Sequence, residues 1–168
     1  MSGVLASIEA CVPALRRYAA VLLRNRQDAD DMVHDTLVRA LGSLHTRREE
    51  HEVRPWLFAI MHNLFVSQLR RTRAHASLEA AGELEGPPGG QEERLRWRDL
   101  VRALNNLPEE QRSVILLVSV EDLSYAEVAR VLGIPIGTVM SRLARAREKL
   151  RLAGHGHEEA RPNLRRVK

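Results

Sequence analysis

The cationic side chains of one predicted helix near the end of the chain are the residues best suited to a chemical role. At about 100° per residue they share a stripe with a threonine, and a serine lies just beyond it: Thr138, Arg142, Arg145, Lys149 and Ser141. Arginine can bond guanine edges through two hydrogen bonds, and both arginine and lysine neutralise phosphates. The stripe predicts a surface that binds double-stranded DNA, although a basic helix face is often only solvated surface.

The opposite side of the same helix is apolar and must be buried. Its members recur at steps of three and four residues, which is the spacing of one helix face: Val139, Leu143, Ala146 and Leu150. The helix is therefore apolar on one side and cationic on a neighbouring side, as expected of a DNA-binding helix that packs on a small core.

A shorter helix with strong end signals is predicted immediately before this one. Ser124 and Glu127 have the spacing of a capping box, in which each side chain accepts a hydrogen bond from the other residue's backbone. Gly133 can adopt the left-handed conformation that ends a helix, and Pro135 suits the first position of the next helix. Helix, tight glycine turn and helix form the helix-turn-helix motif, which makes DNA binding the favoured interpretation of the basic stripe.

The first segment, residues 1–75, has a helical pattern that one polar loop interrupts. Its apolar residues recur at steps of three and four, which predicts three helices. Asp28 is the predicted N-cap of the second helix, because its carboxylate can accept backbone hydrogen bonds at a helix start. The loop is predicted from His45 to Val53, and Pro55 suits the first turn of the third helix.

Composition changes sharply over residues 76–93. This stretch holds glutamates without lysine or arginine, and it contains a Gly-Pro-Pro-Gly-Gly run, which together predict a flexible acidic linker. The helical pattern resumes over residues 94–152, and residues 153–168 form a polar tail that we expect to fray. The expected fold class is therefore all-α, with two small helical domains joined by the linker.

Composition also limits the partners of the chain. It has 168 residues, a formal charge of +4 and an isoelectric point near 10.0, which favour a polyanionic partner. No apolar run approaches the roughly 20 residues that span a bilayer, so we expect no membrane insertion. The single cysteine, Cys11, cannot form an intrachain disulfide. We expect a buried thiol in a reducing, cytoplasmic setting.

No catalytic or metal-binding set is legible in the sequence. We find no Ser-His-Asp arrangement, glycine-rich phosphate loop or pair of catalytic carboxylates. His155 and His157 are close together but lack the further ligands that a metal needs. We therefore expect a binding protein without a cofactor, and not an enzyme.

The helix-turn-helix half resembles region 4 of the extracytoplasmic-function (ECF) sigma factors, which are members of the sigma-70 family. Four stretches carry this resemblance: Leu107–Arg112, Leu123–Ala129, Gly137–Leu143 and Arg145–Arg147. Met140 departs from the pattern, since the family often has lysine there, which removes one expected phosphate contact.

The first segment resembles region 2 of the same family. Asp28–Leu37 is similar to its acidic core-binding helix, and Arg54–Asn63 is similar to its promoter-melting helix. Ser67 stands where an acidic residue is common. The two resemblances together cover nearly the whole chain up to Leu152, in order and in spacing.

The resemblance implies the partners and the site residues. Members of the family bind the clamp coiled coil and the flap of RNA polymerase core, contact promoter DNA, and are restrained by an anti-sigma factor that is often linked to a membrane. Core binding then falls on Asp28, Asp31 and Asp35. A cationic loop and helix that capture unpaired bases of the minus-ten element comprise Arg47, Arg48, Arg54, Trp56, Asn63, Arg70 and Arg71. The basic stripe is then the surface that binds the minus-thirty-five element. For Trp56, packing between helices is the favoured alternative to DNA binding.

Two other functions fit part of the sequence. A dimeric helix-turn-helix regulator would bind a palindrome, but the first segment offers an acidic helix and a basic helix where such a regulator has a sensor pocket. A sigma-mimicking adaptor would sequester an anti-sigma factor, but it would tolerate loss of the basic stripe, which is intact here. We expect a sigma factor, monomeric when free, that directs polymerase to promoters and opens them.

Overall fold

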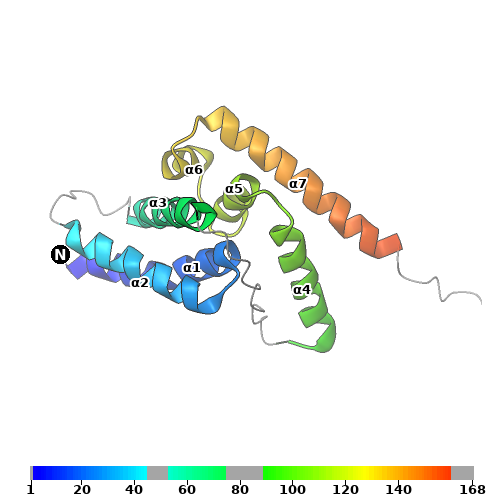
Figure 1. Cartoon of the computed structure of the whole chain (residues 1–168), viewed down its shortest axis with the longest axis horizontal. Coiled ribbons are helices and arrows are strands. Elements are labelled where there is room, and N and C mark those ends of the chain that lie inside the picture. The colour runs from blue at the N-terminus through cyan, green and yellow to red at the C-terminus, as the bar shows by residue number, and fades with distance from the viewer. Residues whose placement is uncertain (1, 45–52, 75–88, 160–168) are drawn as a thin grey trace, which may run out of the picture.

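The computed structural model describes residues 2–44, 53–74 and 89–159, which form seven helices and no strand. The first half of the described chain comprises α1 (Ser2–Leu23), α2 (Arg26–Gly42) and α3 (Val53–Ala74). The second half comprises α4 (Gln91–Asn105), α5 (Glu109–Ser119), α6 (Tyr125–Leu132) and α7 (Ile136–Glu159), as Figure 1 shows. The expected all-α fold class is confirmed.

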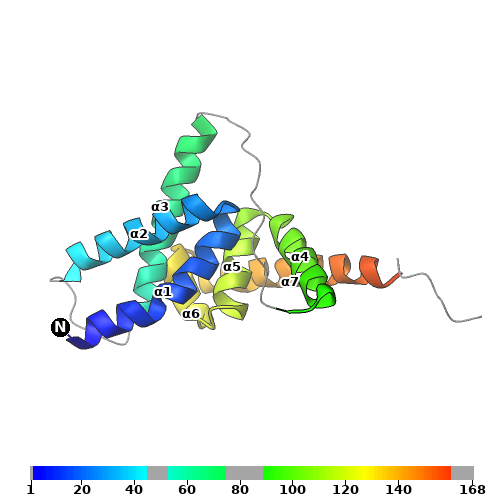
Figure 2. The ribbon, with the colours of Figure 1, turned by 90° about the horizontal axis from the view of Figure 1, so that it is seen from below.

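In the first half, α1 and α2 lie side by side and α3 crosses both. The aromatic rings of Tyr18 and Phe58 meet edge to face with centroids 5.3 Å apart, and both residues are fully buried with Leu15 and Leu57. This edge-to-face packing adds to the free energy gained by burying the rings. Figure 2 shows that the C-terminal end of α3 projects beyond the other two helices.

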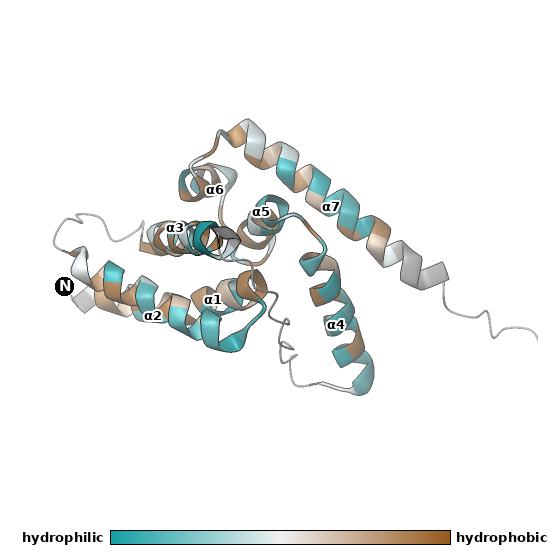
Figure 3. Ribbon diagram, in the orientation of Figure 1, coloured by the Kyte–Doolittle hydropathy of each residue, from teal (hydrophilic) through white to brown (hydrophobic). Residues whose placement is uncertain are grey.

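In the second half, α6 and α7 pack on α5, and α4 leads into α5 from outside. Val139, Leu143 and Ala146 on α7 are almost fully buried, and Leu150 is half-buried. The predicted apolar face of α7 is therefore confirmed. Figure 3 shows hydrophilic residues along α4, and also along α2 in the first half.

The predicted end signals of α6 are also confirmed. Ser124 Oγ accepts a hydrogen bond from the backbone nitrogen of Glu127 at 3.2 Å, and Glu127 Oε2 accepts one from the backbone nitrogen of Ser124 at 2.8 Å. Gly133 ends the helix in the left-handed conformation with φ of 64°, which costs glycine little because it has no Cβ. These local signals fix the angle at which α6 leads into α7.

The two halves pack against each other. α3 lies along α6, and α1 contacts α5, so that the buried apolar residues of both halves form one continuous cluster. The surfaces that α1 and α3 turn toward α5 and α6 are therefore covered by protein.

Helix boundaries differ from the expected ones at several points. Asn25, and not Asp28, caps α2, because Asn25 Oδ1 accepts from the backbone nitrogen of Asp28 at 3.1 Å and thereby places Asp28 in the first turn. Val53 opens α3 and is buried, which removes it from the predicted loop. Pro135 precedes the first residue of α7, since its carbonyl accepts the bonds from Thr138 and Val139.

Two helices extend further than expected. α4 begins at Gln91, inside the predicted linker, and an ion pair of 2.7 Å between Glu92 and Arg96 supports its first turns. α7 continues to Glu159, past the expected start of the tail. The rest of the predicted loop, linker and tail, residues 45–52, 76–88 and 160–168, lies outside the described residues. No helix in the described ranges is long and apolar enough to cross a membrane.

Candidate nucleic-acid interface

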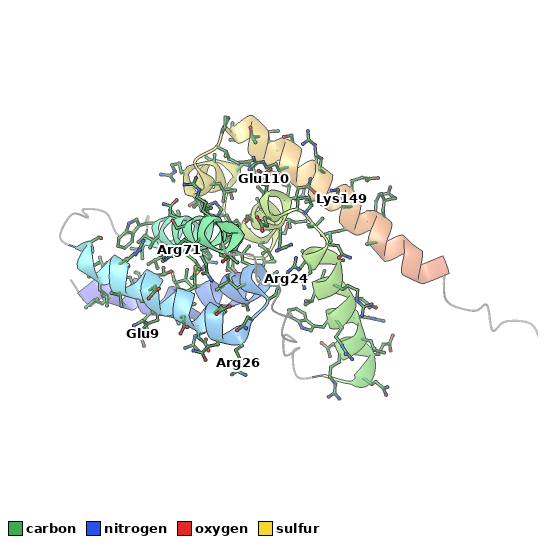
Figure 4. The ribbon with its side chains drawn as sticks, in the orientation of Figure 1. Glu9, Arg24, Arg26, Arg71, Glu110 and Lys149 are labelled. Atoms are coloured by element: carbon green, nitrogen blue, oxygen red, sulfur yellow. The ribbon has the colours of Figure 1, made fainter. Side chains whose placement is uncertain are left out.

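The N-terminal two thirds of α7 present the cationic surface predicted from the sequence. Ser141, Arg145 and Lys149 are exposed, and Thr138 is half-buried; Figure 4 labels Lys149 on this helix. Ser141 Oγ donates a hydrogen bond to the carbonyl of Thr138 at 3.1 Å. The structure therefore leaves three of the five predicted minus-thirty-five residues open to a duplex.

Arg142 lies differently from the other cations of α7. Its side chain is 23% exposed, and Nη2 lies 3.4 Å from Oε2 of Glu110 on α5; Figure 4 labels Glu110. Arg142 also raises the positive potential at His62 of α3. The guanidinium thus sits where α3, α5 and α7 meet, turned toward the first half of the chain.

His62 is the titratable group at this junction. Its Nδ1 atom is buried and has no hydrogen-bond partner among the described residues. Burial and the neighbouring charge of Arg142 lower the pKa of His62 to about 4. His62 and Arg142 line a cavity of about 650 Å³ between the two halves, together with Glu109, Glu110 and Arg112.

On α3, the predicted minus-ten residues separate into two groups. Asn63 and Arg70 are exposed, as is Ser67 between them, and this spacing places the three on one side of the helix. Arg71 is also exposed, and its Nε donates to the carbonyl of Ser67 at 3.4 Å. Trp56, at the other end of α3, packs against the core.

Arg54, the remaining described member of the predicted minus-ten set, is bound within the protein. Its Nη2 donates to Glu121 Oε2 at 2.8 Å and to the Glu121 carbonyl at 2.9 Å. Arg17 donates to the same carboxylate through Nε at 3.3 Å and Nη2 at 3.1 Å. Glu121 is only 1% exposed. We call these three residues the Glu121 ion-pair cluster. Arg47 and Arg48 lie outside the described residues.

The predicted core-binding residues lie together on α2. Asp31 and Asp35 are exposed and Asp28 is half-buried. All three line a small cavity of about 120 Å³, to which α3 contributes Gln68 and Arg71; Figure 4 labels Arg71. Arg71 therefore lies between the acidic face of α2 and the polar face of α3.

Sequence reasoning missed the arginines that hold the α4–α5 turn. Arg112 is 3% exposed and donates to the carbonyls of Leu104, Asn105 and Leu107 at 2.9, 3.0 and 2.8 Å. Arg24, labelled in Figure 4 at the end of α1, donates to the same Asn105 carbonyl at 2.6 Å. Burial and the charge of Arg24 lower the pKa of Arg112 to about 10, so that it remains charged near neutral pH.

Cys11 is buried, as expected, beside the Glu121 ion-pair cluster. Burial raises the pKa of its thiol, and the positive charge of Arg54 acts in the opposite direction. Within the part of the chain that the structure describes, no three side chains of the histidine, cysteine, aspartate or glutamate type come close enough to hold a metal ion.

Comparisons with known proteins agree with this geometry. Residues 97–150 match the family described as "Sigma-70, region 4", and residues 8–62 match the "Sigma2 domain of PhyR". The ECF RNA polymerase sigma factor EcfG of Rhodopseudomonas palustris is 38% identical over 146 residues, which cover 85% of this chain and 80% of that protein. SigM of Mycobacterium tuberculosis is 37% identical over 144 residues, which cover 84% of this chain and 72% of SigM.

Solved structures give the same result. The sigma factor RpoE of Bartonella quintana, solved with the anti-sigma factor NepR, has a TM-score of 0.78 and 32% identity, over 87% of this chain and 92% of that one. CnrH, solved with the cytosolic domain of CnrY, has a TM-score of 0.67 and 28% identity, over 89% of this chain and 85% of that one. Two helical halves, the second ending in a helix-turn-helix, define a sigma-70-type architecture. The chain belongs to the ECF RNA polymerase sigma factors.

Proposed function

We propose that the chain binds RNA polymerase core and directs it to promoters. The observation that carries this proposal is the presence, on one chain, of a capped helix-turn-helix with exposed cations and of an acidic helix face beside a polar one. Ser141 and Arg145 on α7 are available to a duplex, whereas Asp31 and Asp35 on α2 are available to a basic protein surface. Neither set alone would connect DNA to polymerase.

Each surface then has its own task. α7 enters the major groove of the minus-thirty-five element, where exposed arginines bond bases and phosphates. Asn63 and Arg70 on α3 face the non-template strand of the minus-ten element after it unpairs, since hydrogen-bonding and cationic groups favour single strands. The acidic face of α2 binds the clamp coiled coil, and the second half binds the flap.

The proposal includes a regulating partner. RpoE was solved with the anti-sigma factor NepR, and CnrH was solved with the cytosolic domain of CnrY. The RpoE complex supports an anti-sigma factor for this chain too. We place the chain in the cytoplasm, where polymerase works, as a monomeric binding protein without catalytic chemistry or cofactor.

Transcription in vitro tests the proposal directly. Core polymerase from a related bacterium, a library of genomic fragments and the purified chain should yield transcripts whose start sites follow a shared two-part motif. Core polymerase without the chain should not yield them. Absence of chain-dependent transcripts, with the chain shown to bind core, would remove the proposed function.

One observation favours a second candidate, the sigma-mimicking adaptor. Residues 8–62 match a domain of PhyR, and PhyR of Bartonella quintana is described as an anti-anti-sigma factor. An adaptor of that kind would bind an anti-sigma factor of the NepR type and give no transcripts with core. The transcription experiment therefore separates the two candidates.

A further inference from the structure

A buried carboxylate joins the two halves of the chain. Glu121 comes from the turn between α5 and α6, and its side chain points into the surface formed by α1 and α3. It accepts three side-chain hydrogen bonds there, from Arg17 and Arg54. Because Glu121 is 1% exposed while Arg17 and Arg54 side chains are 54% and 36% exposed, the acid depends on the arginines far more than they depend on it.

The turn holds Glu121 in place before it meets its partners. The backbone nitrogens of Val120 and Glu121 both donate to the Leu116 carbonyl at 3.0 Å. Asp122 then adopts a left-handed conformation with φ of 55°, which aspartate tolerates better than most residues. A carboxylate on such a fixed turn loses little conformational freedom when it binds the arginines.

A second contact also joins the two halves. Arg24, at the end of α1, donates to the Asn105 carbonyl at the end of α4. Arg142 of α7 faces His62 of α3 across the cavity between the halves. We call this packing of the two halves the closed arrangement. In it, Arg54 is paired with Glu121 across the halves, whereas Arg142 is paired with Glu110 within the second half.

A carboxylate and a DNA phosphate compete for the same face of a guanidinium group. We propose that Glu121 is an intramolecular competitor of promoter DNA, which occupies Arg54 until the α5–α6 turn leaves α1 and α3. The closed chain is then an autoinhibited state, and its opening frees Arg54 for the DNA backbone. The competition rests on the proposed function and on the minus-ten role predicted for Arg54 from the sequence, whereas the closure itself rests on neither.

The matched variants Glu121→Gln and Asp122→Asn test this on the full chain. Both remove one negative charge from the same turn, but Asp122 is exposed and its side chain forms no ion pair within the described residues, and asparagine tolerates the left-handed conformation. Small-angle X-ray scattering measures the closed fraction. Titration with a mixed-sequence single-stranded DNA of about 20 nucleotides, at low salt, measures access to Arg54.

Glu121→Gln should raise the ratio of open to closed chain about tenfold, the effect of weakening one charged hydrogen-bond set. Its DNA affinity should rise and become more salt-dependent, and adding Arg54→Met should abolish that gain. Asp122→Asn should leave both readouts unchanged. Circular dichroism confirms that each variant is folded.

Two outcomes would overturn the inference at different points. A Glu121→Gln chain as compact as the natural one shows that the cluster does not hold the halves together, and it leaves the proposed function intact. A chain that opens without gaining affinity shows that Arg54 does not contact DNA, which overturns the competition and removes Arg54 from the predicted minus-ten set.

Discussion

Arg112 shows how one residue can organise a whole turn. The last carbonyls of a helix have no partner within the helix, and at the end of α4 the buried guanidinium of Arg112 satisfies the carbonyls of Leu104 and Asn105, as well as that of Leu107 beyond it. Arg112 therefore helps to set the direction in which α5 leaves α4, together with Arg24, which donates to the same Asn105 carbonyl.

Replacing Arg112 by methionine should lower the free energy of unfolding by about 3 kcal/mol, because it removes three hydrogen bonds from a buried guanidinium and leaves the Leu107 carbonyl without its arginine donor. Urea unfolding followed by circular dichroism measures the change. Arg102→Met is the matched control, since Arg102 lies on α4 with a 70% exposed side chain and a loose 3.9 Å pair to Asp99. The control should change stability by less than about 0.5 kcal/mol. Equal effects of the two substitutions would assign no special role to Arg112.

His62 makes the stability of the fold depend on pH in the acidic range. Its pKa is about 4 in the folded chain, below the ordinary value of 6.5. Between these values the unfolded chain binds a proton that the folded chain does not, so stability falls as the pH drops from 6.5 toward 4. From pH 7 to about pH 5 the loss attributable to His62 should be about 2 kcal/mol.

Unfolding free energies measured across this pH range check the effect of His62. His62→Gln should flatten the acid limb of the profile. His34→Gln, which removes an exposed histidine of α2, should leave the profile unchanged. Parallel profiles for the natural chain and His62→Gln would contradict the assignment.

At the scale of the helices, α2 presents an acidic face for which the described structure gives only local partners. Asp31 accepts from Gln27 at 3.1 Å on the same helix. Reversing Asp31 and Asp35 to lysine should weaken binding to polymerase core at least tenfold, because two attractive charges become repulsive. Fluorescence anisotropy of a labelled chain with core measures the affinity.

The control for this experiment carries the same change in charge elsewhere. Asp30 and Glu9 are exposed acids outside the predicted core-binding set, and Figure 4 labels Glu9 on α1. Reversal of both to lysine should leave core affinity within about twofold if contact, and not net charge, decides binding. A similar loss in both double variants would refute a specific role for Asp31 and Asp35.

On α7, Arg145 and Arg142 should behave differently although they belong to one predicted stripe. Arg145 is exposed and free to bond a base or phosphate, so Arg145→Ala should cost about 1–3 kcal/mol in binding the minus-thirty-five duplex. Arg142 must first leave Glu110, so Arg142→Ala should cost less. Holoenzyme binding to a promoter found by transcription in vitro provides the measurement.

Arg151→Ala is the control on the same helix, because Arg151 lies outside the stripe and pairs with Glu148 at 2.8 Å. It should leave affinity for the duplex nearly unchanged. If Arg142→Ala costs as much as Arg145→Ala, the pairing with Glu110 has no influence on DNA binding.

The helices can be predicted because their signals lie within a few residues of sequence. The contacts between the halves cannot, because they join residues that are far apart in the sequence. The capping box of Ser124 and Glu127 spans three residues, so its geometry follows from spacing alone. Arg54 and Glu121 are 67 positions apart, and no periodicity links them. The predicted cap of α2 is wrong because Asn25 and Asp28 are both good N-cap residues, and only the path of the backbone decides between them.

At the scale of the whole molecule, the two ends of α3 lie in different surroundings. One end packs along α6 through the continuous core, and the other end projects beyond α1 and α2 (Figure 2). The exposed face with Asn63 and Arg70 has no partner among the described residues of the second half in the closed arrangement, whereas the partly exposed Arg54 is paired with Glu121. In the closed arrangement, the contact with the second half therefore occupies only part of the predicted minus-ten surface.

The single cysteine makes this opening measurable by labelling kinetics on the natural chain. Cys11 is 7% exposed and lies against Arg54, so a thiol reagent reaches it only in molecules that have opened, and the observed rate scales with the open fraction. Glu121→Gln should accelerate labelling about tenfold, as its open fraction rises, and Asp122→Asn should not. If Glu121→Gln leaves the labelling rate unchanged, the thiol of Cys11 becomes accessible through another motion. Since the sequence has no second thiol, DNA, polymerase core and any protein partner can each be ranked by how far it speeds or slows this one reaction.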